Sequence, residues 1–145
     1  METRTSIEIW GERGSKLLPH VLVDTGATFS TISRETAEEL GIRAVRNRIF
    51  RTVQGTVEMP IGVASLAIDG QETTQEVVIL EHGPELIGLL TLEALSLKVD
   101  TTTGRLEPAG PLNLLGIFLD RHFGPVRGAF PSGSQPEADG GVPQI

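Results

Sequence analysis

Alternating apolar and polar positions dominate the first two thirds of the chain. The alternating or apolar-rich runs, each bounded by turn residues, cover residues 6–10, 17–23, 47–59, 63–68 and 76–80. Gln54-Gly55 divides the third run, and Asp69-Gly70 between the last two runs favours a primed hairpin turn. A two-residue period with frequent turn signals is typical of strands that bury one face. The pattern therefore predicts a mostly β fold.

Two short stretches carry helix signals instead of strand signals. Ser33 is placed to cap a helix over residues 34–40, and Gly41 is placed to end it. Thr91 is placed in the same way to cap a second helix over residues 91–95. The sequence thus predicts one or two short helices beside the strands.

The composition changes near residue 108, where the alternating pattern ends. Six of the nine prolines lie from Pro108 onward. We expect one domain over residues 1–107, followed by a Pro/Gly-punctuated apolar extension over residues 108–130 that packs on the domain or on a second subunit. Residues 131–145 are of low complexity and are expected to be disordered. A chain of 145 residues has room for one such core.

Composition and charge argue against several classes of function. The net charge of −7 and the pI near 4.9 argue against nucleic-acid binding. The chain has no cysteine, and its three histidines show no metal-ligand spacing, so no metal or cofactor is expected. No apolar run reaches the roughly 18–20 residues of a membrane helix, so no membrane partner is expected. No signal peptide is visible behind Met1, and we expect a cytoplasmic protein.

Asp24 ends an apolar run and enters a tight turn. A carboxylate at the end of a buried strand is costly unless its charge is hydrogen-bonded or its proton is shared. Gly26 lets backbone N–H groups approach this carboxylate, and Thr25 adds a hydroxyl. Phe29 and Ile32, in the segment that leads away, are expected core residues. Asp-Thr-Gly also forms ordinary turns, but those need no apolar run before them, so we favour an acid whose protonation is controlled.

Val23-Asp24-Thr25-Gly26-Ala27 resembles the active-site loop of the retroviral-type (retropepsin-like) aspartic proteases. A second feature of that family, two apolar residues and a glycine before a short helix, is matched by Leu86-Ile87-Gly88. Residues 97–100 and 104–106 resemble the closing strands of small single-domain bacterial members. The resemblance covers roughly residues 5–107.

The resemblance implies a closed acid-protease β-barrel with one lobe per chain, which acts as a homodimer. It implies that Asp24 is catalytic and that Thr25, Gly26 and Ala27 support the active-site loop. It further implies that Leu86, Ile87 and Gly88 are structural support for the site.

Two carboxylates about 3 Å apart can share one proton, so that one activates water while the other polarises the carbonyl of a peptide bond. Asp100 is a tempting second acid, but Gly104 follows it by four residues where Gly26 follows Asp24 by two. The segment around Asp100 is better interpreted as a hairpin turn. We therefore expect the second acid to be Asp24 of a partner chain across a two-fold axis.

Residues 49–59 match the family's hairpin that closes over the substrate, with Val53, Gln54 and Gly55 at the tip. Gly55 permits the tip conformation, and an extended peptide would add there as a strand. An ordinary surface hairpin remains the alternative. Four arginines precede or enter this hairpin: Arg43, Arg46, Arg48 and Arg51. They form either a solvated face or a preference for acidic substrate residues.

The function favoured by these residues is that of a homodimeric aspartic endopeptidase that acts on a peptide or protein substrate. A second hypothesis is a non-catalytic dimerisation or peptide-binding module that keeps the same barrel. The intact Asp24-Thr25-Gly26 triplet favours the first, because a binding module has no need of an acid that shares a proton.

Overall fold

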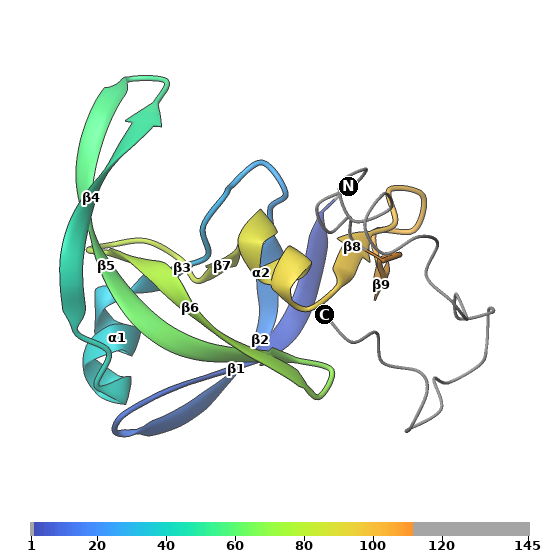
Figure 1. The fold of residues 1–145 in the computed structure, drawn as a ribbon, viewed down its shortest axis with the longest axis horizontal. Coiled ribbons are helices and arrows are strands. Elements are labelled where there is room, and N and C mark those ends of the chain that lie inside the picture. Colours follow the sequence, from blue (N-terminus) through green and yellow to red (C-terminus); the bar gives the residue numbers. More distant parts are fainter. Residues whose placement is uncertain (1, 112–145) are drawn as a thin grey trace, which may run out of the picture. The chain divides into compact units, whose positions relative to one another are not determined.

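The structure is a computed structural model that describes residues 2–111 (Figure 1). Residues 112–130 of the predicted extension and the whole predicted tail lie outside the described residues. The elements follow in the order β1 (Thr3–Gly11), β2 (Gly14–Val23), β3 (Thr31–Ser33), α1 (Arg34–Leu40), β4 (Ala44–Thr52), β5 (Gly55–Ile68), β6 (Gln71–Leu80), β7 (Leu86–Ile87), α2 (Leu89–Ala94), β8 (Leu97–Val99) and β9 (Leu106–Pro108).

Seven strands form one sheet in the order β1-β2-β7-β3-β6-β5-β4, and β8 pairs with β9 in a separate two-stranded sheet. β1 also pairs antiparallel with β5, so the sheet curls back on itself. Two pairings are parallel, β2 with β7 and β3 with β6. Because Val23 lies opposite Ile87 in the first of these, Asp24 and Gly88 leave the sheet at the same edge. The prediction of a mostly β fold with two short helices is confirmed.

The core is built from the apolar positions of the alternating runs. Ile7 and Ile9 on β1 are at most 1% exposed, and so are Leu66 and Ile68 on β5. Ile9 lies directly opposite Leu66 where the two strands pair. Each such side chain contributes roughly 1.5–3 kcal/mol when it is fully removed from water. The core therefore lies between strands for which the two-residue period predicts one buried face and one exposed face.

Helix α1 begins and ends where its capping residues predict. Ser33 has extended backbone angles, and its Oγ accepts a hydrogen bond from the Thr36 backbone N–H at 3.1 Å. Gly41 takes a left-handed φ of 73°, and its N–H bonds the carbonyls of Ala37 and Glu38. The predicted span of residues 34–40 is confirmed.

Helix α2 begins two residues earlier than the sequence predicts. Its cap is Gly88, which offers no side chain, and Thr91 lies inside the helix with none of its surface exposed. The prediction that Thr91 caps the helix is wrong, because its hydroxyl bonds to side chains of other elements. The helix N-terminus is held instead by contacts with the loop that follows β2.

The prediction that Phe29 is a core residue is wrong. Phe29 is only half-buried and lies before β3, which begins at Thr31. The Phe29 ring meets Phe50 of β4 edge to face, with centroids 5.5 Å apart. Ile32, by contrast, is 1% exposed, as predicted for a core residue.

The predicted hairpin turns are confirmed. Asp69 and Gly70 both have positive φ, 51° and 80°, as a primed turn requires. β4 and β5 pair from Ala44 opposite Gly62 to Thr52 opposite Gly55, so the hairpin around Gln54 is longer than the alternating run over residues 47–59. Within the described part of the chain, no helix is long and apolar enough to cross a membrane.

Candidate active site

Asp24 stands directly after β2, where its backbone is still tied to β7. Its N–H donates to the carbonyl of Ile87 at 2.9 Å, and its own carbonyl accepts from the N–H of Ala27 at 3.1 Å. The Gly26 N–H donates to Oδ1 of Asp24 at 2.9 Å. The carboxylate is exposed and makes no ion pair with the residues described. An accessible acid is thus fixed by one backbone donor and left open for chemistry.

Gly88 lies against the loop that carries Asp24, at a distance that only glycine permits. A Cβ at this position would lie 2.5 Å from both the carbonyl carbon and oxygen of Phe29. The close approach lets the first two residues of α2 bond the loop: Leu89 N–H donates to Ala27 O at 2.8 Å, and Leu90 N–H donates to Thr28 O at 3.0 Å. Gly88 therefore supports the loop through backbone contacts.

A buried hydroxyl relay lies beneath the same loop and was not found in the sequence. Ser30 Oγ accepts from the Gly88 N–H at 2.9 Å and lies 2.6 Å from Thr91 Oγ1. Thr91 Oγ1 donates to Gln75 Oε1 at 2.7 Å, and Gln75 Nε2 donates to the Leu90 carbonyl at 3.0 Å. Because each hydroxyl has one hydrogen, Ser30 must donate to Thr91. The relay joins β6, α2 and the Asp24 loop.

Ser30 and Gln75 carry no local signal, since each stands next to other polar residues and nothing in the sequence distinguishes it from them. Ser30 and Thr91 are 61 residues apart in sequence, and only the fold brings them together. Their burial, 3% and 0% exposed, is what marks them as structural parts of the site.

The remaining predicted site residues lie around Asp24 or at the end of the hairpin. Thr25 is exposed beside Asp24, and Ala27 is half-buried. At the hairpin tip, Val53 is fully exposed, and Thr52 Oγ1 accepts from the Gln54 N–H at 3.2 Å and donates to the Gly55 carbonyl at 2.7 Å. Figure 1 shows the end of the β4–β5 hairpin projecting from the sheet on the same side as the loop between β2 and β3.

A cavity of about 840 Å³ opens beside Asp24. Its wall is largely apolar, from α2 and the β8–β9 hairpin, and includes Leu89, Leu92, Leu97 and Val99. Leu89 is 37% exposed and its neighbour Leu90 40%. An accessible acid therefore borders a cavity with exposed leucine side chains beside it.

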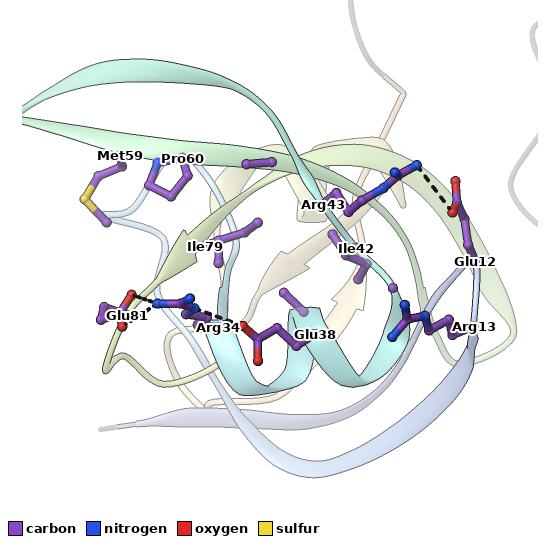
Figure 2. Close-up of a pocket in the computed structure, with 13 residues that line it drawn as sticks. Glu12, Arg13, Arg34, Glu38, Ile42, Arg43, Met59, Pro60, Ile79 and Glu81 are labelled. Carbon is purple, nitrogen blue, oxygen red and sulfur yellow. Dashed lines mark hydrogen bonds and ion pairs between the residues drawn. The ribbon is translucent and has the colours of Figure 1, made fainter.

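A second cavity, of about 760 Å³, lies over α1 and contains no residue of the Asp24 loop (Figure 2). Its charged side chains largely bond one another: Arg34 donates to Glu38 at 3.0 Å and to Glu81 at 2.8 Å. Arg43 and Glu12 lie 3.7 Å apart at the other end. The carboxylates of Glu38 and Glu81 are engaged by Arg34, whereas that of Asp24 is in no ion pair among the residues described, so we take the surroundings of Asp24 as the candidate site.

Asp100 is committed to its own loop between β8 and β9. Its Oδ1 accepts from the Thr102 N–H at 2.8 Å, and its carbonyl accepts from the Gly104 N–H at 2.7 Å. The bond from Thr102, aided by bonds from Thr103, holds the pKa of the Asp100 carboxyl below its usual value. The prediction that this segment is a hairpin turn is confirmed.

Glu85 ties the start of α1 to the segment before β7. Its Oε1 accepts from Ser33 Oγ at 2.8 Å and from Thr36 Oγ1. Burial raises the pKa of Glu85, but the bonds from Thr36 and Ser33 outweigh burial and hold the pKa below its usual value. The charged carboxylate of Glu85 thus ties the chain just before Leu86-Ile87-Gly88 to the start of α1.

Comparison with known proteins agrees with this geometry. A family model described as aspartyl protease matches residues 13–94, more than half of the chain. The solved structure of the EIAV protease, in complex with the inhibitor HBY-793, aligns with a TM-score of 0.53 and 19% identity over 69% of this chain and 93% of that chain. No curated protein matches the sequence. The likeness to the viral enzyme is one of fold, and the two findings together confirm the retropepsin-like resemblance.

Proposed function

The chain belongs to the aspartyl protease family, and from this premise we propose that it is an aspartic endopeptidase whose catalytic acid is Asp24. The observation that carries the proposal is the state of this carboxylate. It is exposed at the end of β2, it borders an open cavity, and the Gly26 N–H fixes one of its oxygens at 2.9 Å. An acid held in this way can exchange protons without first breaking an ion pair.

The proposed chemistry needs two carboxylates that share one proton. The charged carboxylate takes a proton from water, whose oxygen bonds the carbonyl carbon, while the protonated carboxyl donates to the carbonyl oxygen. The tetrahedral gem-diol then collapses: one of its hydroxyls returns a proton to the pair as the carbonyl re-forms, the C–N bond breaks, and the amine nitrogen receives a proton from the pair, which is left with one shared proton. One hydrogen of water ends on the amine and its OH on the acyl carbon.

We propose that the second carboxylate is Asp24 of a second copy, in a homodimer. Among the described residues, Asp100 is the other acid in a comparable turn, and its carboxylate is engaged in its own loop. The exposed Leu89 and Leu90 beside Asp24 support a partner at this face, because burying them removes apolar surface from water. The added pairing of β1 with β5 likewise supports the closed barrel.

The substrate would be an extended peptide between the Asp24 loop and the β4–β5 hairpin. Backbone groups at the tip, around Val53, Gln54 and Gly55, would bond it as an added strand. The Gln54 N–H and the Gly55 carbonyl would exchange their bonds with Thr52 for bonds with the peptide. Gly55 has a φ of 123° with open space around its Cα, so its backbone can approach a peptide closely.

Asp24→Asn tests the chemistry. Digestion of casein and of a peptide library, with and without pepstatin, should show cleavage by the wild type that pepstatin blocks, and a loss of at least about 1000-fold in Asp24→Asn because an amide cannot serve as the base. Asp69→Asn is the matched control, since Asn is well accepted in that primed turn and should leave turnover unchanged. Wild-type turnover in Asp24→Asn would transfer the chemistry elsewhere, and a folded wild type that binds peptides without cleaving them would favour the non-catalytic module.

The shared site is tested by mixing. Excess Asp24→Asn chains should suppress wild-type turnover by forming mixed dimers, and turnover per chain should fall on dilution. Full activity from a chain shown to be monomeric by light scattering would rule out the shared dyad.

A further inference from the structure

Arg48 of β4 reaches the loop that carries Asp24. Its Cζ lies over the ring of Phe29, 5.1 Å from the centroid, and Phe50 of the same strand meets that ring edge to face. Phe29 is five residues after Asp24 in the loop between β2 and β3. A guanidinium over an aromatic face is held by electrostatic attraction and keeps donors free for a further partner. The hairpin thus places a cation against the catalytic loop.

The face of the hairpin that carries this cation follows from strand geometry. Side chains alternate along a strand, so Arg48 and Phe50 share one face, which contacts Phe29. Ile49 and Arg51 point to the opposite face. Glu58 lies directly opposite Ile49 in the β4–β5 register, so it too belongs to the face away from Arg48.

Arg48 lacks the carboxylate partner that Arg43 and Arg46 have. Arg46 donates to both carboxylate oxygens of Glu76, at 2.8 and 2.6 Å, and Arg43 lies 3.7 Å from Glu12. The bond from Arg46 holds the pKa of Glu76 below its usual value against the effect of burial, and the nearby charge of Arg48 adds to this lowering without bonding Glu76. Arg48 makes no hydrogen bond or ion pair with a side chain in residues 2–111.

The hairpin is also a local exception to the charge of the chain. It carries three arginines and one glutamate, whereas the whole chain has a net charge of −7. An unpaired cation on the side that meets the catalytic loop would attract an anionic group of a bound peptide.

We propose that Arg48, seated on Phe29, is a specificity-determining residue that selects an acidic side chain at a fixed distance from the cleaved bond. The inference rests on the proposed protease function and names its substrate class. The peptide carboxylate would accept hydrogen bonds from the guanidinium edge, while the aromatic pair below holds that edge in place. Arg51, on the opposite face of the same strand, would not contribute.

Digestion of a proteome-derived peptide library, read by mass spectrometry, tests the preference. Because the dimer carries two copies of Arg48, wild-type protein should show Asp and Glu enriched at a fixed distance from the cleaved bond, on one side or on both. Arg48→Gln should lose this enrichment while still cleaving neutral sequences, and the matched control Arg51→Gln should keep it. Unchanged enrichment in Arg48→Gln, or wild-type cleavage without any acidic enrichment, would overturn the proposal.

A matched pair of peptides that differ by Glu or Gln at the enriched position gives the magnitude. The wild-type kcat/KM should favour Glu by about fivefold, the size expected of a partly exposed ion pair, and the ratio should shrink in 1 M NaCl. Arg48→Gln should bring the ratio near one, Arg48→Lys should retain part of it, and Arg48→Glu should reverse it toward a Lys peptide. A ratio that is equal in wild type and Arg48→Gln contradicts the proposal.

The two proposals fail in different ways. A folded wild type that cleaves no peptide removes the protease function and this inference with it. A wild type that cleaves peptides, loses activity in Asp24→Asn and ignores the charge of the peptide removes only the role of Arg48.

Discussion

Ser30→Ala isolates the contribution of the buried relay beneath the Asp24 loop. The substitution removes one oxygen and adds no volume, so it cannot clash. Ser30 Oγ accepts from the Gly88 N–H at 2.9 Å and donates to Thr91 Oγ1 at 2.6 Å, and Ser30 is 3% exposed. Alanine therefore leaves a buried N–H without its acceptor.

The size of the loss follows from what each partner keeps. The orphaned Gly88 N–H costs about 1–3 kcal/mol, because water has little access to replace the bond. Thr91 loses one bond but still donates to Gln75 at 2.7 Å, so its share is smaller. We expect the free energy of unfolding to fall by about 2 kcal/mol. Ser65 offers a matched control, since its Oγ also lies near a threonine hydroxyl, 2.9 Å from Thr74, but at an exposed site. Ser65→Ala should change the free energy of unfolding by less than about 0.5 kcal/mol.

Urea unfolding at one fixed protein concentration measures both variants. Ser30→Ala should lower the midpoint at an unchanged slope, and turnover per folded chain should also fall because the loop loses its support. If the two alanine variants unfold at the same urea concentration, the relay does not stabilise the site and this account of it is wrong.

Two further substitutions act on the same framework. Gly88→Ala places a Cβ 2.5 Å from the Phe29 backbone and should cost about 3 kcal/mol of stability, measured by thermal unfolding, whereas Gly110→Ala, with open space around it, should be neutral. Burial raises the pKa of Glu85, but hydrogen bonds led by that of Thr36 hold it lower, so its carboxylate stabilises the fold above about pH 4.5 and less as pH falls through the lower folded pKa. Glu85→Gln should therefore lower the unfolding temperature at pH 7 by more than it does at pH 3, and an equal loss at both values would contradict the role of the charge.

Local signals in the sequence were sufficient to predict the elements whose conformation depends on neighbouring residues. Helix α1 begins after Ser33 and ends at Gly41, because a cap hydroxyl and a left-handed glycine act within one turn of the helix. Asp69-Gly70 forms its primed turn for the same reason, since both residues accept a positive φ. These elements were predictable to the residue.

Long-range partners decided the positions that the sequence could not predict. Thr91 is of a residue type that often caps helices, yet its hydroxyl forms hydrogen bonds with Ser30 and Gln75, which are distant in sequence. The helix begins at Leu89 instead. Phe29 is of a residue type that is usually buried in the core, yet it packs outside the core, against Phe50 of the hairpin. No pattern of nearby residues contains either partner, because both are brought close only by the sheet.

The bonds that position Asp24 lie within one chain, whereas the contacts proposed to complete the site come from a second copy, so the two can be tested separately. The backbone of Asp24 is held by Ile87, its carboxylate by Gly26, and the relay below ends at Gln75, all within one chain. None of these bonds requires a partner. In the proposed dimer the second copy supplies the other carboxylate and covers apolar side chains such as Leu89. Defects in the relay therefore lower the free energy of unfolding at every protein concentration, whereas a defect at Leu89 lowers activity only where the dimer dissociates, and a dilution series tells the two apart.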